Sequence, residues 1–183
     1  MTIFHNEKDY ERFLMKMKQY KEDYNIHLLA WAVMPNHFHL ILKGNVDNNA
    51  KVKPLGKSIE SCNLRSLIHG LQTSYTMYYN RKYEHSGHVF QGRFKSKHVN
   101  SDAYLIQLIN YIHSQPSHHN IFSDPAGLKD EEYPYTSLND YLMLSNPAFK
   151  ITDIDDSLID VKDYAKIFED FKRLNMNDAN EEF

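Results

Sequence analysis

Two histidines, His37 and His39, have the residue type and spacing to support chemistry. They stand one residue apart at the start of an apolar, strand-like run. Side chains alternate between the two faces of a strand, so both imidazoles point the same way, about 7 Å apart along the backbone. Such a pair can hold one metal ion while Phe38 faces a core. Ordinary half-buried strands with alternating polar residues give the same pattern, so the pair alone does not distinguish a metal site from such a strand.

A β-hairpin is predicted to present this pair. Residues 26–33 form a second strand-like run, and Met34-Pro35-Asn36 has the composition of a turn. The hairpin would therefore carry a candidate metal site on one of its faces.

Amphipathic helices are predicted around the hairpin, because apolar residues recur there every three to four positions. Asn6 can cap the first helix and Ser101 the third, whereas Gly70 is an unfavourable residue in the interior of the second helix. Tyr111 and Gln115 are four residues apart at the end of the third helix, so their side chains share one face. The predicted helices span residues 7–24, 59–81, 101–114 and, in the tail, roughly 158–171.

Charge is distributed unevenly along the chain. Residues 51–97 hold nine Lys and Arg against two acids, and residues 120–183 hold fifteen acids against six Lys and Arg. A basic middle region suggests an anionic partner, although segregated surface charges give the same pattern. Within residues 86–97, Arg93, Lys95 and Lys97 alternate and are predicted to share one face of a strand. Such a face could contact DNA phosphates, or it could be a charged edge strand that resists aggregation. The candidate DNA contacts are Arg81, Lys82, His88, Arg93, Lys95 and Lys97.

Composition indicates one soluble globular domain with a possible tail. No apolar run is long enough to span a bilayer, and the start of the chain lacks the pattern of a signal peptide, so a cytoplasmic, bacterial protein is expected. The remaining histidines are interpreted as surface or loop residues; they are His5, His27, His69, His85, His98, His113, His118 and His119.

Several ordered motifs together resemble the single-tyrosine HUH transposases, most closely their REP-associated branch. The matching stretches are Met34-Pro-Asn-His-Phe-His-Leu-Ile-Leu42, Gly87-His-Val-Phe-Gln-Gly-Arg-Phe-Lys95, Ser101-Asp-Ala-Tyr-Leu105 and Tyr111-Ile-His-Ser-Gln-Pro116, with Tyr133-Pro-Tyr-Thr-Ser137 similar to a Pro-Trp-Ser-Ser element. This resemblance implies a catalytic domain over residues 1–142 and leaves residues 143–183 as an acidic extension with one amphipathic helix.

The resemblance also implies an α+β fold, with a ferredoxin-like antiparallel sheet and helices packed on one face. It implies that Tyr111 is the nucleophile and that His37, His39 and Gln115 bind Mg²⁺ or Mn²⁺. The implied activity is that of a nickase and transposase that cuts and rejoins single-stranded or hairpin DNA through a 5′-phosphotyrosine intermediate.

One departure from the family pattern keeps an alternative open. Related proteins have a strand ahead of the part that matches Ile3-Phe4, and the sequence starts at Met1, so this first strand is expected to be missing. The alternative is a domesticated or decayed protein that binds hairpin DNA without cutting it. A zinc hydrolase is a third interpretation, but it lacks a convincing acid or base. An open sheet edge and an apolar tail helix would also suit a homodimer.

Overall fold

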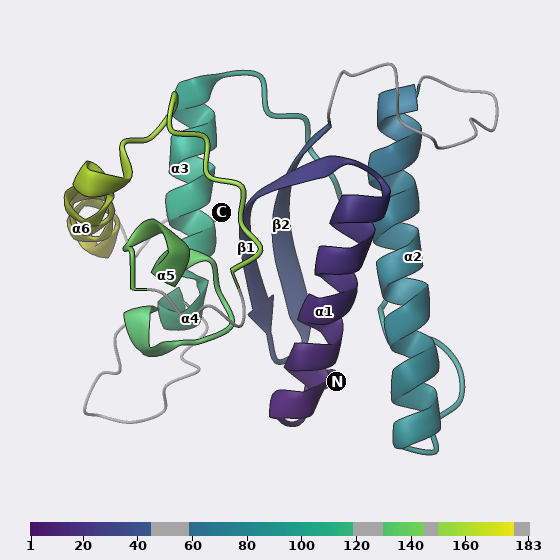
Figure 1. Ribbon diagram of the computed structural model, residues 1–183. Coiled ribbons are helices and arrows are strands. Elements are labelled where there is room, and N and C mark those ends of the chain that lie inside the picture. The colour runs from purple at the N-terminus through teal and green to yellow at the C-terminus, as the bar shows by residue number, and fades with distance from the viewer. Residues whose placement is uncertain (45–58, 119–129, 145–149, 178–183) are drawn as a thin grey trace. The chain divides into compact units, whose positions relative to one another are not determined.

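The structure, a computed structural model, describes residues 1–44, 59–118, 130–144 and 150–177. Within these ranges the elements are helices and one antiparallel sheet of two strands, so the predicted α+β class is confirmed. Figure 1 shows the elements. They are α1 (Glu7–Asp23), β1 (Ile26–Met34), β2 (His37–Gly44), α2 (Ile59–Lys82), α3 (Asp102–His113), α4 (Gln115–His118), η1 (Asp130–Glu132), α5 (Leu138–Tyr141) and α6 (Val161–Asn177).

The predicted hairpin is confirmed. Strands β1 and β2 pair directly, and only Pro35 and Asn36 separate them. Strand β1 is buried along almost its whole length, as its continuous apolar sequence requires, whereas β2 is mostly half-buried. Strand β2 therefore has a partly accessible face on which polar side chains can stand.

The chain forms two compact units, each assembled from separate stretches of sequence. The first unit contains residues 1–28, 33–38 and 42–97, and the second contains residues 29–32, 39–41 and 98–183. Both strands thus contribute residues to both units. The boundary expected at residue 142 from the family resemblance stays a prediction.

In the first unit, α1 and α2 lie side by side (Figure 1). The apolar stripe of α1, which includes Phe13 and Met17, is buried as expected. Helix α2 runs unbroken through Gly70, so the helix predicted over residues 59–81 is confirmed. A Cβ atom at Gly70 would lie 3.2 Å from ring atoms of Tyr20 on α1. The glycine therefore permits the two helices to approach closely.

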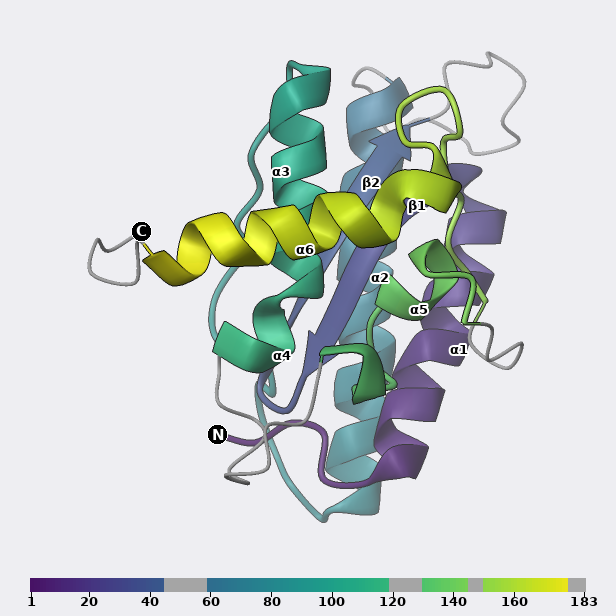
Figure 2. The ribbon, with the colours of Figure 1, turned by 90° about the vertical axis from the view of Figure 1, so that its left-hand side faces the viewer.

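In the second unit, α6 crosses α3 and packs beside α5 (Figure 2). Its Tyr164 and Phe168 side chains are buried together with Tyr141 of α5. Helix α6 begins at Val161, so the predicted start near Leu158 is wrong: Leu158 lies in the preceding turn, where its amide donates to Asp155 O.

Residues 136 and 137 extend the pairing of β1 in the second unit. Thr136 forms an isolated antiparallel bridge with Ala32, and the Ser137 amide donates to Trp31 O over 2.9 Å. This short contact fixes the chain before α5 against β1. No helix in the described part of the chain is long and apolar enough to cross a membrane.

Candidate functional site

His37 opens β2 directly after the hairpin turn, and its ring is oriented by its neighbour. Its Nδ1 lies 2.6 Å from Asn36 Oδ1. A carbonyl oxygen can only accept a hydrogen bond, so Nδ1 carries the proton and the lone pair of the ring lies on Nε2. A histidine that binds a metal through one nitrogen commonly donates the other N–H to an oxygen in this way.

Phe38, between the two histidines, faces a core as predicted. In the first unit its ring lies 5.0 Å from that of Phe13 and 5.6 Å from that of Phe90. Because side chains alternate along a strand, the packing of Phe38 places His37 and His39 together on the opposite face of β2.

Tyr111 stands near the end of α3, the helix that Ser101 caps by accepting a hydrogen bond from the Tyr104 amide. Its side chain is 38% exposed, whereas the next residue, Ile112, is buried. The ring of Tyr111 lies 6.2 Å from that of His39, at an interplanar angle of 80°. The second unit therefore brings the predicted nucleophile beside one of the two predicted metal ligands.

Gln115 follows α3 and is 1% exposed. Its Nε2 donates to the backbone carbonyl of Tyr111 over 3.2 Å, so the Gln115 side chain lies against the last turn of α3. Its buried Oε1 has no hydrogen-bond partner among the described residues. A buried carbonyl oxygen without a partner is costly, so this atom is suited to receive a ligand.

The predicted metal ligands are two imidazoles and one amide oxygen; His37 belongs to the first unit, whereas His39 and Gln115 belong to the second. Within the described ranges, no group of three or more His, Cys, Asp or Glu residues is arranged to hold a metal. Binding of a cation by His37, His39 and Gln115 Oε1 stays a prediction. The orientation of His37 and the unpaired oxygen of Gln115 both fit that role.

Of two other histidines in the second unit, His113 differs from expectation and His118 agrees with it. His113 is fully buried, so its interpretation as a surface residue is wrong: both of its ring nitrogens are hydrogen-bonded inside the protein. His118 is exposed, but its ring lies 6.1 Å from that of Tyr111. The spacing of seven residues, two helical turns, is the sequence signal for this neighbour. His119 lies outside the described residues.

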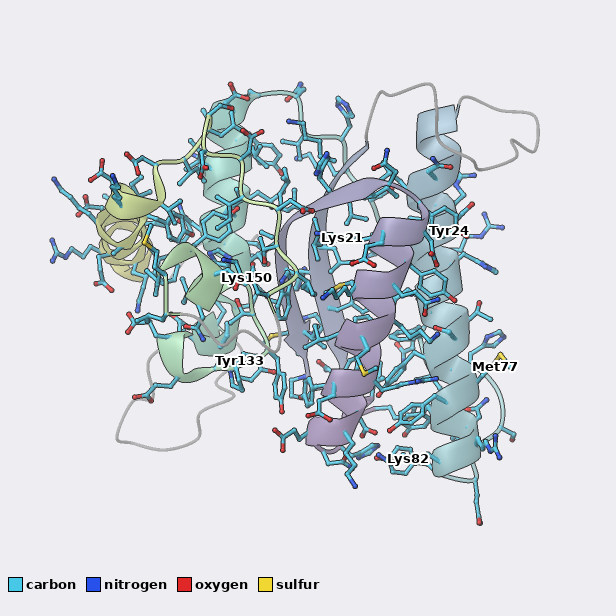
Figure 3. The ribbon with its side chains drawn as sticks, in the orientation of Figure 1. Lys21, Tyr24, Met77, Lys82, Tyr133 and Lys150 are labelled. Atoms are coloured by element: carbon cyan, nitrogen blue, oxygen red, sulfur yellow. The ribbon has the colours of Figure 1, made fainter. Side chains whose placement is uncertain are left out.

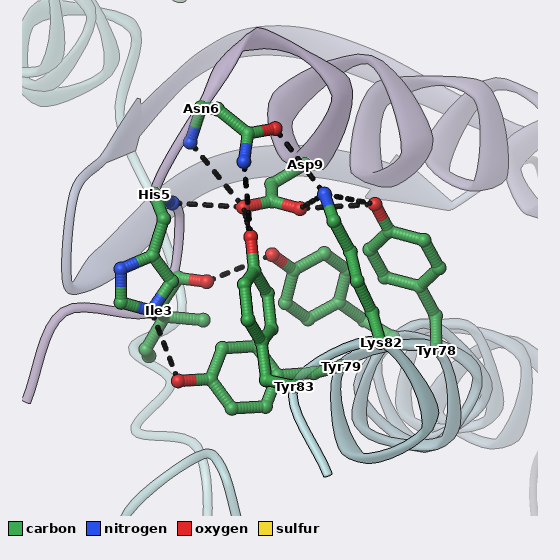
Figure 4. A network of polar contacts seen from close by, with 9 residues as sticks. Ile3, His5, Asn6, Asp9, Tyr78, Tyr79, Lys82 and Tyr83 are labelled. Carbon is green, nitrogen blue, oxygen red and sulfur yellow. Dashed lines mark hydrogen bonds and ion pairs between the residues drawn. The ribbon is translucent and has the colours of Figure 1, made fainter. Parts of the chain in front are cut away.

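The cationic candidates lie in the first unit, and Lys82 has a specific environment there (Figures 3 and 4). Its ammonium group donates to Asn6 Oδ1, Asp9 Oδ1 and the Tyr78 hydroxyl. An ammonium group has three hydrogens, so these acceptors use all of them. Lys82 thus joins the end of α2 to the start of α1, and its assignment as a DNA contact stays a prediction.

Asp9 is the centre of this network and is completely buried. Besides Lys82, its carboxylate accepts hydrogen bonds from the Tyr78 and Tyr83 hydroxyls and from the amides of His5 and Asn6. Burial raises the pKa of Asp9, but the hydrogen bonds together outweigh burial and leave this pKa below its usual value. The carboxylate is therefore charged and paired.

We expect Lys82→Met to lower the free energy of unfolding by about 2–4 kcal/mol, because it leaves the buried Asp9 carboxylate without its counter-ion. Arg81→Met, at an exposed neighbouring position on the same helix, serves as the matched control and should change it by less than about 0.5 kcal/mol. Urea unfolding followed by circular dichroism measures both. Equal stabilities for the two variants would contradict the structural role of Lys82.

The segment from 86 to 97 contains no strand, so the expectation of three cations on one strand face is wrong. Gly87 and Gly92 have φ values of 98° and 68°, which interrupt an extended conformation. Val89 is buried and Phe90 contacts Tyr75, whereas the polar side chains around them are exposed. The exposed candidates on this segment are His88, Arg93, Lys95 and Lys97.

Comparison with known proteins identifies the family. The family model described as "Transposase IS200 like" matches residues 1–115, which is more than half of the 183 residues. No curated protein and no solved structure matches the chain. The matched region contains the hairpin with His37 and His39 and helix α3 with Tyr111, and it ends at Gln115. The chain belongs to the IS200-like transposase family.

Proposed function

We propose that this protein cleaves and rejoins single-stranded or hairpin DNA through a covalent bond between Tyr111 and a 5′-phosphate. The observation that carries the proposal is the grouping of an exposed tyrosine, a histidine ring 6.2 Å away and, four residues further on, a buried amide oxygen that no described residue pairs with. Membership of a transposase family makes DNA the expected substrate.

The reaction uses the phenol of Tyr111 as nucleophile. Its oxygen attacks the phosphorus of a phosphodiester, the phenolic proton leaves to solvent, and the P–O3′ bond breaks. The departing 3′ oxygen takes up a proton and becomes a free hydroxyl, while the 5′-phosphate stays on Tyr111. Attack of a 3′-hydroxyl on this link reverses the step, so strand joining needs no nucleotide cofactor.

His37, His39 and Gln115 are the residues that would hold a divalent cation beside the scissile phosphate. Such an ion would supply Lewis-acid polarisation of the phosphate and stabilise its developing negative charge. Carbonyl oxygen suits Mg²⁺ and Mn²⁺, whereas two imidazoles depart from the all-oxygen shell that Mg²⁺ prefers, so we propose Mn²⁺ as well as Mg²⁺.

DNA binding without cleavage is the second candidate function. The exposed cations Arg93 and Lys95 on an anchored segment favour it, because phosphate contacts need no catalytic residues. Both candidate functions predict salt-dependent binding to DNA, so only a covalent product separates them.

End-labelled hairpin DNA from the flanks of the gene tests the proposal. With Mn²⁺, a strand labelled at its 3′ end should yield a labelled protein–DNA adduct, because the 5′-phosphate of the 3′ fragment is the part that stays attached. The same strand labelled at its 5′ end should yield only a shorter free fragment. Chelation by EDTA should abolish both products, and mass spectrometry should place the adduct on Tyr111. Binding without any adduct would favour the second function.

A further inference from the structure

Helix α6 lies beyond the residues that the family model matches, yet it is built into the second unit around α3. Tyr164 is fully buried and Phe168 nearly so. Their rings contact the ring of His113 on α3, at centroid distances of 5.6 and 6.3 Å. Figure 2 shows α6 lying across α3. The tail helix therefore covers the face of α3 that carries His113.

Tyr164 also bonds to α3 at two places. Its hydroxyl lies 2.8 Å from Asn110 Oδ1 and 2.6 Å from His113 Nδ1. Because Asn110 Oδ1 can only accept, the phenolic hydrogen is donated there. His113 Nδ1 must then carry a hydrogen and donate it to the Tyr164 oxygen, which fixes the tautomer of this buried imidazole.

The tautomer sets the direction of the remaining bonds. His113 Nε2 is now an acceptor, and the Ser137 hydroxyl, 2.7 Å away, is its donor. Ser137 Oγ in turn accepts from the Trp31 amide over 2.9 Å. The alternative bond from Ser137 to Trp31 O is longer, at 3.2 Å, and would leave Nε2 without a donor. All four bonds then run in one direction, from Trp31 through Ser137, His113 and Tyr164 to Asn110, an arrangement in which hydrogen bonds strengthen one another.

A catalytic role for this chain of bonds does not fit the structure. Ser137 and His113 form a serine–histidine pair, but each is 0% exposed, so no substrate can reach the hydroxyl. Burial lowers the pKa of His113 to about 3, so the ring is neutral and serves as a fixed donor and acceptor. The hydrogen bonds therefore have a structural role: they join β1, α3, α6 and the residue before α5.

The effect of these hydrogen bonds on Tyr111 follows from helix geometry. Asn110 and His113 lie one residue before and two residues after Tyr111, and both are buried and bonded to Tyr164. A helix turns by about 100° per residue, so anchoring these two side chains inward directs Tyr111 outward. A rotation of α3 about its axis would break both bonds at once.

We propose that Tyr164 is a positioning residue for the nucleophile, and that α6 completes the active-site helix of this transposase. Through Asn110 and His113 it fixes the rotation of α3 and so the direction of the Tyr111 phenol. This inference rests on the proposed function, in which Tyr111 attacks DNA. It assigns a role to a part of the chain outside the matched family region.

The test compares Tyr164→Phe with Tyr141→Phe, which is matched to it. Tyr141 belongs to the same buried aromatic cluster, but its hydroxyl donates to Leu29 O rather than to α3. Each variant loses one buried hydroxyl and keeps its ring. Three quantities are measured for each: the dissociation constant for hairpin DNA, the single-turnover rate of adduct formation at saturating DNA, and amide hydrogen exchange in α3.

We expect Tyr164→Phe to slow adduct formation at least tenfold while the dissociation constant changes less than twofold. Amide exchange over residues 105–113 should rise at least tenfold in this variant. Tyr141→Phe should stay within twofold of wild type in rate and in α3 exchange, even where its melting temperature falls equally. Equal losses of rate in both variants would mean that general destabilisation is the cause, and would overturn the positioning role.

Failure of the proposed function gives a different result. If wild type forms no adduct, Tyr111 is not a nucleophile for this DNA, and Tyr164 then cannot be a positioning residue for a nucleophile. The exchange measurement then still decides whether Tyr164 anchors α3. Unchanged exchange in Tyr164→Phe, together with a normal adduct rate, would overturn the inference while leaving the proposed function intact.

Discussion

Tyr111→Phe is expected to form no covalent adduct with hairpin DNA, because the phenyl ring of phenylalanine has no oxygen to attack phosphorus. The rate of adduct formation should fall by at least about 10⁴-fold. The ring itself remains, and with it the contact to His39. Folding and DNA binding should therefore stay at wild-type levels. Denaturing gels with 3′-labelled DNA measure the adduct, and fluorescence anisotropy measures binding.

Tyr104→Phe is the matched control for this variant, because Tyr104 is half-buried in the first turn of the same helix. It should form adduct at the wild-type rate. An adduct that persisted in Tyr111→Phe would move the nucleophile to another residue. A variant that lost binding as well as cleavage would show that the phenol contributes to DNA recognition.

Acidification from pH 7 to pH 5 is expected to destabilise the protein by about 2 kcal/mol through His113 alone. The pKa of His113 is about 3 in the folded protein, because burial disfavours the charged ring, against 6.5 for an ordinary histidine. Between these values the unfolded chain binds a proton that the folded protein does not. Stability due to His113 is therefore complete above pH 6.5 and decreases as the pH falls toward 3.

Urea midpoints measured every half pH unit test this dependence. His113→Gln should be less stable throughout but should lose this part of the slope between pH 7 and 5. Tyr141→Phe, a destabilised variant that keeps His113, should retain it. Asp9 does not confuse the result, because its pKa lies below 3.8 and its loss of charge belongs to more acidic conditions. A wild-type midpoint that stayed constant down to pH 5 would contradict a buried, neutral His113.

Much of the fold could be predicted because its signals are local. The capping residues Asn6 and Ser101 mark the starts of α1 and α3, and the Pro35-Asn36 turn marks the hairpin. The neighbourhood of Tyr111 and Gln115 likewise follows from a spacing of four residues. In each case the physical cause lies within a few residues of the effect.

The remaining features depend on contacts between distant parts of the sequence. Lys82 and Asp9 are 73 residues apart, and nothing near Lys82 indicates that its charge is already paired. His113 and Tyr164 are separated by 51 residues, so a histidine on an amphipathic helix gave no sign of complete burial. The strand expected around Arg93 is absent, because alternation of cations along a sequence does not supply the partner strand that a sheet requires.

The position of Trp31 gives the protein an internal spectroscopic reporter. It is the only tryptophan of the chain, it is 1% exposed, and its indole Nε1 donates to Thr152 Oγ1 while its amide begins the bonds to Ser137. All these partners belong to the second unit. Its emission will therefore follow the melting of that unit alone, whereas circular dichroism also senses α1 and α2. Two superimposable melting curves would show that the halves of this transposase unfold as one cooperative body, and two separate curves would resolve them without any label.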